Sequence, residues 1–300
     1  MFDAIGIGRN CVDFLAVLDG LPVENSKARV REHLVEGGGQ SSTATVALAR
    51  LGLKTAFAGL VGDDEEGQFS LRSLARDGVD TSLVRIIPEA ATPVAQIWVN
   101  RRSGTRTIAY LDSMRGRLAP ELFSRESLLD SGCILVDPFG AELALSLVPE
   151  ARRRGIPVVY DAEHYGDGLD EMLSAADYVV ASEEVMPVLG AASPEEALEK
   201  IFARGGKQAV VITRGERGSL GLSGRVFHHE PAVAVNVVDT TAAGDAYHAG
   251  FAYGVIRGWD LSGCMRMGAV LGALVCRDLG GRRSLPDLAE AMRVMGEENI

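Results

Sequence analysis

The chain has 300 residues, 47% of them hydrophobic and 24% charged, and this ordinary globular composition excludes general disorder. Its 30 basic and 41 acidic residues give a formal net charge of −11, which argues against a dedicated binder of nucleic acid or of anionic membranes. No apolar run is long enough to span a bilayer, the N-terminus does not resemble a signal peptide, and the four cysteines form no CxxC pair. We therefore expect reduced thiols, a cytoplasmic location, and neither nucleic acid nor membrane as a partner.

Predicted strands and helices alternate through the first 80 residues, a pattern typical of βαβ units. Apolar residues spaced three and four apart predict the helices, and a glycine follows each of them. The expected elements are a strand at 3–8, an extended stretch at 12–18, a helix over about 44–51, a strand at 55–61 and a helix over about 66–76.

Two short segments at 94–100 and 105–111 interrupt this alternation. They are separated by Arg-Arg-Ser-Gly, a connection typical of a β-hairpin. Together with part of the extended stretch near the N-terminus, the hairpin is expected to form a small sheet, a lid built from about 10–35 and 94–111. The rest of residues 1–300 is expected to form one domain with it.

The alternation resumes in the second half of the chain. In the segment SPEEALEKIFARGG, Ser193, Pro194 and Glu196 stand at the N-cap, N1 and N3 positions of a predicted helix with a capping box. The other expected elements are strands at 133–138, 156–161, 178–182 and 208–213, a helix at 141–155, short strands between 219 and 239, and helices to the end. The predicted fold class is α/β, a doubly wound, mostly parallel sheet flanked by helices, with a small β-sheet lid.

The most informative stretch, VNVVDTTAAGDAYHAGFAYGVIRG, predicts an apolar strand ending at Asp239 and a helix beginning near Ala243. Small residues at 242–244 let backbone N–H groups approach a ligand at a helix N-terminus, where the helix dipole favours an anion. A carboxylate in that first turn, Asp245, could accept the proton of an attacking hydroxyl, as phosphoryl transfer requires. From the residues alone, Asp245 could equally serve only to stabilise the helix N-terminus.

Residues 239–245, Asp-Thr-Thr-Ala-Ala-Gly-Asp, resemble the C-terminal signature of the ribokinase/PfkB carbohydrate kinase family, D-T-x-[GA]-A-G-D. The segments 37–52 and 59–67 resemble its N-terminal signature. Other stretches, among them the late CRDLGGRRSLPD, are similar to a subgroup that includes sulfofructose kinase and, more loosely, ketohexokinase. The resemblance spans essentially the whole chain and implies an ATP-dependent kinase acting on a primary hydroxyl of a small sugar.

The resemblance also implies roles for individual residues. Asp245 becomes the general base, and the backbone of Ala242, Ala243, Gly244 and Asp245 becomes the anion hole for the γ-phosphate. The implied sugar contacts are Asp13, Gly37, Gly38, Gly39 and Ser42, where Ser42 stands at the family's usual asparagine, with Lys27 as a candidate partner for an anionic sugar. Lys27 could equally be a solvated lid residue.

The nucleotide is expected near Thr213, Gly215 and Gly218, because VVITRGERGS resembles the family's T-x-G-x-x-G segment at a strand end. The family's Asn-x-x-Glu, which organises Mg²⁺ and phosphate, is replaced by Ala-Ser-Glu-Glu, so Glu184 or Glu183 is the candidate. The implied cofactors are ATP and Mg²⁺.

The family's potassium site matches Asp239 and the Thr241 carbonyl, with residues 280–284 as its other wall. Asp239 could instead cap the loop, so the need for potassium stays open. Many relatives pair through the lid, which implies a homodimer.

Three alternatives remain open at this stage. The acceptor could be a nucleoside or a sugar phosphate, or the chain could be a non-catalytic sugar sensor on a kinase fold. The Gly6-x-Gly8 segment could indicate a nicotinamide-dependent oxidoreductase, but it lacks the third glycine and the acidic partner of that motif.

Overall fold

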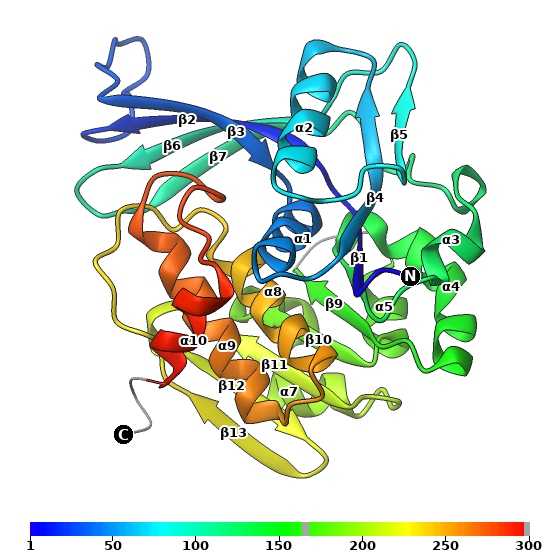
Figure 1. The fold of residues 1–300 in the computed structure, drawn as a ribbon. Helices are drawn as coiled ribbons and strands as arrows, with labels where there is room; N and C mark the ends of the chain where they lie inside the picture. The colour runs from blue at the N-terminus through cyan, green and yellow to red at the C-terminus, as the bar shows by residue number, and fades with distance from the viewer. Residues whose placement is uncertain (164–167, 297–300) are drawn as a thin grey trace.

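The computed structural model describes residues 1–163 and 168–296, which form a nine-stranded and a four-stranded sheet with helices (Figure 1). The nine-stranded order is β13-β12-β11-β10-β9-β8-β1-β4-β5. Its strands are β1 (Ala4–Ile7), β4 (Thr55–Gly62), β5 (Val84–Ile87), β8 (Ile134–Val136), β9 (Val158–Ala162), β10 (Tyr178–Ser182), β11 (Ala209–Thr213), β12 (Ser219–Ser223) and β13 (Val226–Glu230).

All neighbouring strands from β5 to β11 run parallel, and β12 and β13 complete the sheet as an antiparallel hairpin. The central strands β4 and β9 are buried along their whole length, as continuous apolar runs between two helical layers require. The predicted doubly wound, mostly parallel α/β fold is confirmed.

Two helical layers bury the two faces of this sheet in separate apolar cores. One face packs against α1 (Gln40–Arg50), α2 (Glu65–Arg76), α8 (Ala243–Ile256), α9 (Leu261–Leu274) and α10 (Leu288–Gly296). The other face packs against α3 (Arg125–Leu129), α4 (Ala141–Arg154), α5 (Leu169–Ala175), α6 (Met186–Leu189) and α7 (Pro194–Phe202). Short 3-10 turns are η1 (Pro120–Leu122), η2 (Pro138–Gly140), η3 (Glu183–Val185), η4 (Gly215–Arg217) and η5 (Val275–Arg277).

The four-stranded sheet is the predicted lid, and Figure 1 shows it projecting to one side of the main body. Its order is β3-β2-β6-β7, with β2 at Cys11–Leu18, β3 at Glu32–Gly38, β6 at Val94–Asn100 and β7 at Arg106–Leu111. A small core of its own, from Leu15 and Ile97 among others, includes Leu279 of the C-terminal loop. The lid is therefore packed onto the loop that follows η5.

The capping box predicted at α7 is half formed. The Ser193 hydroxyl accepts a hydrogen bond from the Glu196 amide at 3.2 Å, as expected of an N-cap. The Glu196 carboxylate accepts from the Ala192 amide at 2.7 Å rather than from that of Ser193. The helix starts where the motif predicts, with one of the two expected side-chain bonds.

The strand predicted to end at Asp239 is wrong, because residues 231–242 form no strand. This segment leaves the edge strand β13, where β12 already occupies the inner side. Val237 and Val238 are about half exposed, and the amides of Val238 and Asp239 donate to the Cys276 carbonyl at 2.8 and 3.4 Å. Apolar residues thus run along an extended connection that has no strand partner.

No helix within residues 1–163 and 168–296 combines the length and the hydropathy needed to cross a bilayer.

Candidate active site

The site is centred on the turn that starts α8. Ala242 precedes the helix with φ of 62°, a left-handed conformation that costs a non-glycine residue about 1–3 kcal/mol. The Ala243 amide closes the turn by donating to the Thr240 carbonyl at 3.2 Å. Backbone strain at this turn is typical of functional sites.

Three backbone amides of this turn have no acceptor within the described part of the chain, namely those of Ala242, Gly244 and Asp245. A Cβ placed on Gly244 would meet no atom within 4 Å, so the turn borders open space. Free N–H groups at the N-terminus of a 14-residue helix form a site for an anion. The Ala243 amide is not among them, since it is used in the turn.

Asp245 lies in the first turn of α8 and is partly buried. Burial raises its pKa to about 7, the nearby Glu163 adds to the rise, and Arg106 opposes it. Arg106 extends from the lid strand β7 and donates Nη1 to the Thr240 hydroxyl at 2.8 Å. A carboxyl with such a pKa can take up a proton and release it near neutral pH.

A buried pair supports the turn from beneath. His248 Nδ1 lies 2.7 Å from the Gly244 carbonyl, and its Nε2 lies 3.1 Å from Asp161 Oδ1. Burial lowers the pKa of His248 and raises that of Asp161 well above its usual range. His248 Nε2 also lies 3.1 Å from the Val180 carbonyl, so the imidazole links the turn at Gly244 to β10 and to Asp161.

The proposed sugar contacts gather where β2 and β3 pair. Asp13 is buried, burial raises its pKa, and the Cys11 thiol donates to it at 3.2 Å. A Cβ on Gly38 would come well within 3.0 Å of the Asp13 carboxylate. Gly39 has φ of 96°, and a Cβ there would overlap the Arg9 carbonyl. Both glycines are therefore required by close approaches.

The three other predicted contacts, Ser42, Lys27 and Gly37, lie in different surroundings. Ser42 is fully buried in α1, and its hydroxyl donates to the Gly38 carbonyl at 2.5 Å. Lys27 lies in the exposed loop between β2 and β3, and no hydrogen bond or ion pair to the described residues holds it. Gly37 is the neighbour of Gly38 within β3.

Sequence reasoning missed three carboxylates at the carboxyl ends of β8 and β9. Asp137 accepts the amides of Arg9 at 2.7 Å and Ser41 at 3.1 Å, which joins the end of β1 to the start of α1. Burial raises the pKa of Asp137 to about 6. Asp161 and Glu163 lie at the end of β9 beside Asp245. Asp137 directly follows β8 and Asp161 is the last residue but one of β9, so the rule that ligands bind at strand carboxyl ends could have found both aspartates.

The predicted nucleotide residues meet at the carboxyl edge of β10 and β11. Thr213 ends β11 opposite Ser182, which ends β10. Gly215 and Gly218 have φ of 56° and 75° in the turn that follows, and a Cβ on Gly218 would overlap the Glu230 carbonyl. The first residues after β10 are the two candidate glutamates, of which Glu183 pairs with Arg217 and Glu184 is exposed.

Asp239, Thr241 and the 280–284 loop also come together as expected. Asp239 is fully buried, and its carboxylate accepts from the Thr241 amide at 2.9 Å, from the Thr241 hydroxyl at 2.8 Å and from the Gly280 amide at 3.0 Å. No basic side chain in the described stretches pairs with this carboxylate. The described residues contain no group of three or more His, Cys, Asp or Glu side chains that could hold a metal ion.

Comparison with known proteins places this geometry in a family. The model of the pfkB family carbohydrate kinases matches residues 1–288. The 5-dehydro-2-deoxygluconokinase of Shouchella clausii (strain KSM-K16) is 27% identical over 325 residues, which cover 100% of this chain and 97% of the relative. The deoxyribokinase of Salmonella typhi is 27% identical over 299 residues, 96% of this chain and 97% of the relative.

Solved structures agree on the fold. A protein of Agrobacterium tumefaciens provisionally assigned as a ribokinase has a TM-score of 0.92 at 28% identity and covers 99% of this chain, with 98% of its own covered. Arabidopsis thaliana ribokinase, solved with ribose and ATP, has a TM-score of 0.84 at 23% identity, with 98% of each chain covered. Since the family model spans nearly the whole chain and the fold agrees along its length, this protein belongs to the pfkB family of carbohydrate kinases.

Proposed function

We propose that the protein transfers the γ-phosphate of ATP to a primary hydroxyl of a small sugar, with Asp245 as the general base. The observation that carries this proposal is the start of α8, where the free amides of Ala242, Gly244 and Asp245 lie beside a carboxyl whose pKa is about 7. Donors for the phosphoryl oxygens and a base for the nucleophile are the groups that phosphoryl transfer needs.

In the proposed reaction the acceptor hydroxyl loses its proton to Asp245 as its oxygen bonds to the γ-phosphorus. The bond from that phosphorus to the β-bridging oxygen breaks, and ADP leaves. Arg106 of the lid already contacts Thr240 beside the anion hole, so closure of the lid would bring a positive charge to the transferring group. The same closure would exclude water and limit hydrolysis of ATP.

ATP would bind across the ends of β10 and β11 near Thr213, Gly215 and Gly218, with Glu183 or Glu184 toward Mg²⁺. The proposal needs no cluster of metal-binding side chains, because Mg²⁺ enters as the partner of the phosphates. The protein of Escherichia coli assigned as ribokinase II was solved with ATP and Mg²⁺ and shares this fold. The buried, oxygen-rich surroundings of Asp239 and Thr241 also fit a potassium ion, which would tune the charge near the anion hole.

The acceptor is tested with a coupled assay of ADP release. The panel takes 5-dehydro-2-deoxygluconate, 2-deoxyribose and ribose from the relatives, and adds fructose, sulfofructose, nucleosides and sugar phosphates, each with and without potassium. ADP release that depends on one sugar class supports the proposal and names the acceptor. Failure to release ADP with every acceptor, while ATP binds, would contradict it and favour a sugar sensor.

The rate is expected to depend on the protonation of Asp245. Because the base must be deprotonated, kcat/KM for the sugar should rise about tenfold per pH unit below pH 7 and level off above it. Glu36 titrates in the same range, since burial raises its pKa to about 7 as well. The fall in kcat/KM below pH 7 should therefore persist in Glu36→Gln. If that variant loses the fall, the titrating group is Glu36 and not Asp245.

The homodimer is proposed to form through the lid. The lid exposes apolar side chains on its edge strand β7 and in the loop before the opposite edge strand β3, among them Ile108, Tyr110, Leu111, Leu21 and Val23. Ile108→Asp should convert a dimer to a monomer in light scattering after gel filtration, because a charge at the interface is costly. Val188→Asp, at an exposed valine on α6 outside the lid, is the control. A wild-type monomer would contradict the proposal.

A further inference from the structure

The two arginines of the 280–284 loop have opposite environments. Arg282 is 2% exposed and is the largest fully buried side chain in the described residues. Its neighbour Arg283 is 41% exposed and pairs with Glu32 at 3.4 Å and Asp278 at 3.6 Å, both on the surface. The sequence Gly-Gly-Arg-Arg-Ser does not distinguish them, so the fold has selected one arginine for the interior.

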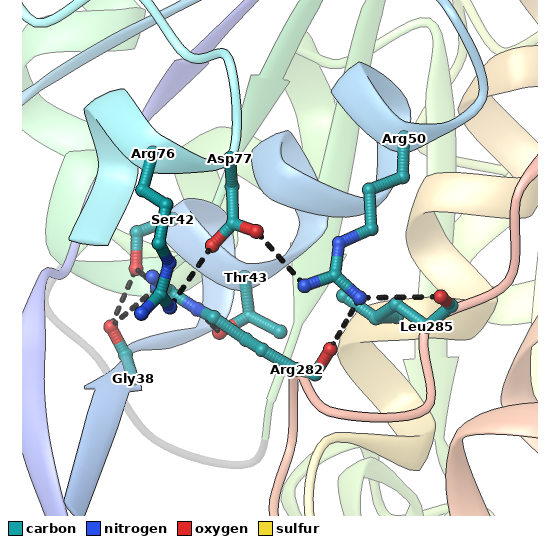
Figure 2. A network of polar contacts seen from close by, with 8 residues as sticks. All are labelled: Gly38, Ser42, Thr43, Arg50, Arg76, Asp77, Arg282 and Leu285. Carbon is teal, nitrogen blue, oxygen red and sulfur yellow. Dashed lines mark hydrogen bonds and ion pairs between the residues drawn. The ribbon is translucent and has the colours of Figure 1, made fainter.

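The Arg282 guanidinium reaches the segment with Gly37, Gly38 and Gly39, the glycines proposed to contact the sugar. Its Nη2 donates to the Gly38 carbonyl at 3.2 Å and to the Ser42 hydroxyl at 3.0 Å, and its Nε donates to the Thr43 hydroxyl at 3.2 Å. Figure 2 shows this side chain extending from its loop to the end of β3 and the first turn of α1. One guanidinium therefore ties together both sides of the Gly39 turn.

The buried charge has no direct counter-ion. No carboxylate of the described residues lies within 4.0 Å of the Arg282 guanidinium, and burial lowers its pKa, although Glu36, Asp13 and Asp77 favour the charged form from farther away. A well-packed apolar side chain would stabilise such a site at least as well as an unpaired charge. The contacts to Gly38 and Ser42 thus give this arginine a role other than bulk stability.

The loop that carries Arg282 is clamped at several points. Arg50, at the far end of α1, donates Nη1 to the carbonyls of Arg282 at 2.6 Å and Leu285 at 3.2 Å, while Asp77 holds its Nη2 at 2.8 Å (Figure 2). The Gly281 amide donates to Glu36, the residue before Gly37. These contacts hold the backbone of Arg282 in place relative to β3 and α1.

Two of the predicted sugar contacts are explained by this guanidinium. A Cβ on Gly37 would overlap Arg282 Nη1, so Gly37 leaves room for the arginine. The Ser42 hydroxyl gives its proton to the Gly38 carbonyl and accepts from Nη2, so neither its proton nor its exposure suits a contact with sugar.

We propose that Arg282 is the positioning residue of the acceptor subsite: it holds the Gly38 carbonyl and the Ser42 hydroxyl so that the Gly38–Gly39 backbone and Asp13 face the sugar. Ser42 and Gly37 act through Arg282 rather than by touching the acceptor. The acceptor part of this inference rests on the proposed function, whereas the ordering of the turn does not.

The first test compares Arg282→Lys with the matched surface variant Arg283→Lys. Lysine keeps the charge, but its single nitrogen cannot take the place of Nη2 at Gly38 and Ser42 and of Nε at Thr43 at the same time. With the best acceptor of the panel, Arg282→Lys should raise KM for the sugar at least about tenfold and leave KM for ATP within about twofold, while Arg283→Lys changes neither. An equal rise in both KM values would show a merely structural role and overturn the proposal.

The second test is a double-mutant cycle of Ser42→Ala and Arg282→Lys in the same assay. If Ser42 acts through Arg282, the double variant should lose about as much as Arg282→Lys alone, because contacting residues of one network are not additive. If the loss of kcat/KM in the double variant equals the product of the two single losses, Ser42 contacts the sugar independently. That result would overturn the inference that Ser42 acts through Arg282.

The third test uses the protein without sugar, so it stands even if no acceptor of the panel is phosphorylated. Hydrogen exchange followed by mass spectrometry should show peptides over residues 36–45 exchanging at least about tenfold faster in Arg282→Lys, with the rest of the chain unchanged. Arg283→Lys should behave as wild type. Uniformly faster exchange, or no change over residues 36–45, would contradict the proposal whatever the panel shows.

Discussion

Replacing Asp245 with asparagine should lower kcat by about 10²–10⁴-fold, the range that a positioned general base contributes. Asparagine keeps the size of the side chain and its place in the first turn of α8, but it cannot accept the proton of the acceptor hydroxyl. The neighbouring amides of Ala242 and Gly244 remain, so the anion site should survive. The measurements are sugar-dependent ADP release and, separately, ATP affinity by calorimetry.

In Asp245→Asn the ATP affinity should stay within about threefold of wild type, because no contact to the nucleotide is removed. The control is Asp130→Asn, a surface carboxylate that pairs with the chain's N-terminus and lies outside the site, which should keep full turnover. Wild-type kcat in Asp245→Asn would refute the assignment of the base.

Gly38→Ala should lower kcat/KM for the sugar by about 10²-fold, the effect of a roughly 1 Å misplacement at a reacting group. A Cβ at this position would lie well within 3.0 Å of the Asp13 carboxylate and would displace it. Turnover of the panel's best sugar measures the loss, and KM for ATP should change little.

Gly20→Ala provides the matched control, since a Cβ on Gly20 would meet no atom within 4 Å. If Gly38→Ala does not fold, Asp13→Asn serves instead, because it removes the Asp13 carboxylate without adding volume. It should lower kcat/KM for the sugar by a similar factor. Unchanged kcat/KM in both variants would exclude Asp13 and Gly38 from the acceptor subsite.

The fold was largely predictable because its signals are local. Apolar runs that end in polar residues indicate the buried parallel strands. The hairpin at 94–111 was predictable because it interrupts the alternation of strands and helices. The strand expected to end at Asp239 failed because pairing is not local. Its valines have the composition of a strand, but the segment pairs with no strand, and the Cys276 carbonyl accepts the amides of Val238 and Asp239 instead.

The sequence predicted the turn at the start of α8, but not the contacts that surround this turn. The motif at 239–245 located the free amides and Asp245, because their placement follows from one turn and one helix. It could not reveal that the Ala243 amide closes the turn. Nor could it reveal that His248, one turn further along α8, contacts the Gly244 carbonyl and is itself contacted by Asp161 of β9. Such contacts join residues far apart in the chain.

The two arginines of the 280–284 loop also show that a sequence motif does not reveal contacts between distant residues. Arg282 and Arg283 are adjacent and chemically identical, yet only the fold decides that Arg282 is buried against Gly37 and Gly38 while Arg283 faces solvent. The polar network around Arg282 in Figure 2 joins β3, both ends of α1 and the C-terminal loop, which no short motif spans.

The most direct measurement is a crystal structure of the protein with ADP, an aluminium fluoride mimic of the transferring phosphoryl group, and the sugar that the panel identifies. The account predicts an Asp245 carboxylate oxygen about 2.6–3.2 Å from the attacking sugar oxygen. It also predicts that amides of Gly244 and Asp245 donate to the fluoride ligands at the start of α8. A mimic bound away from that turn, or an Asp245 carboxylate out of reach of the sugar oxygen, would contradict it.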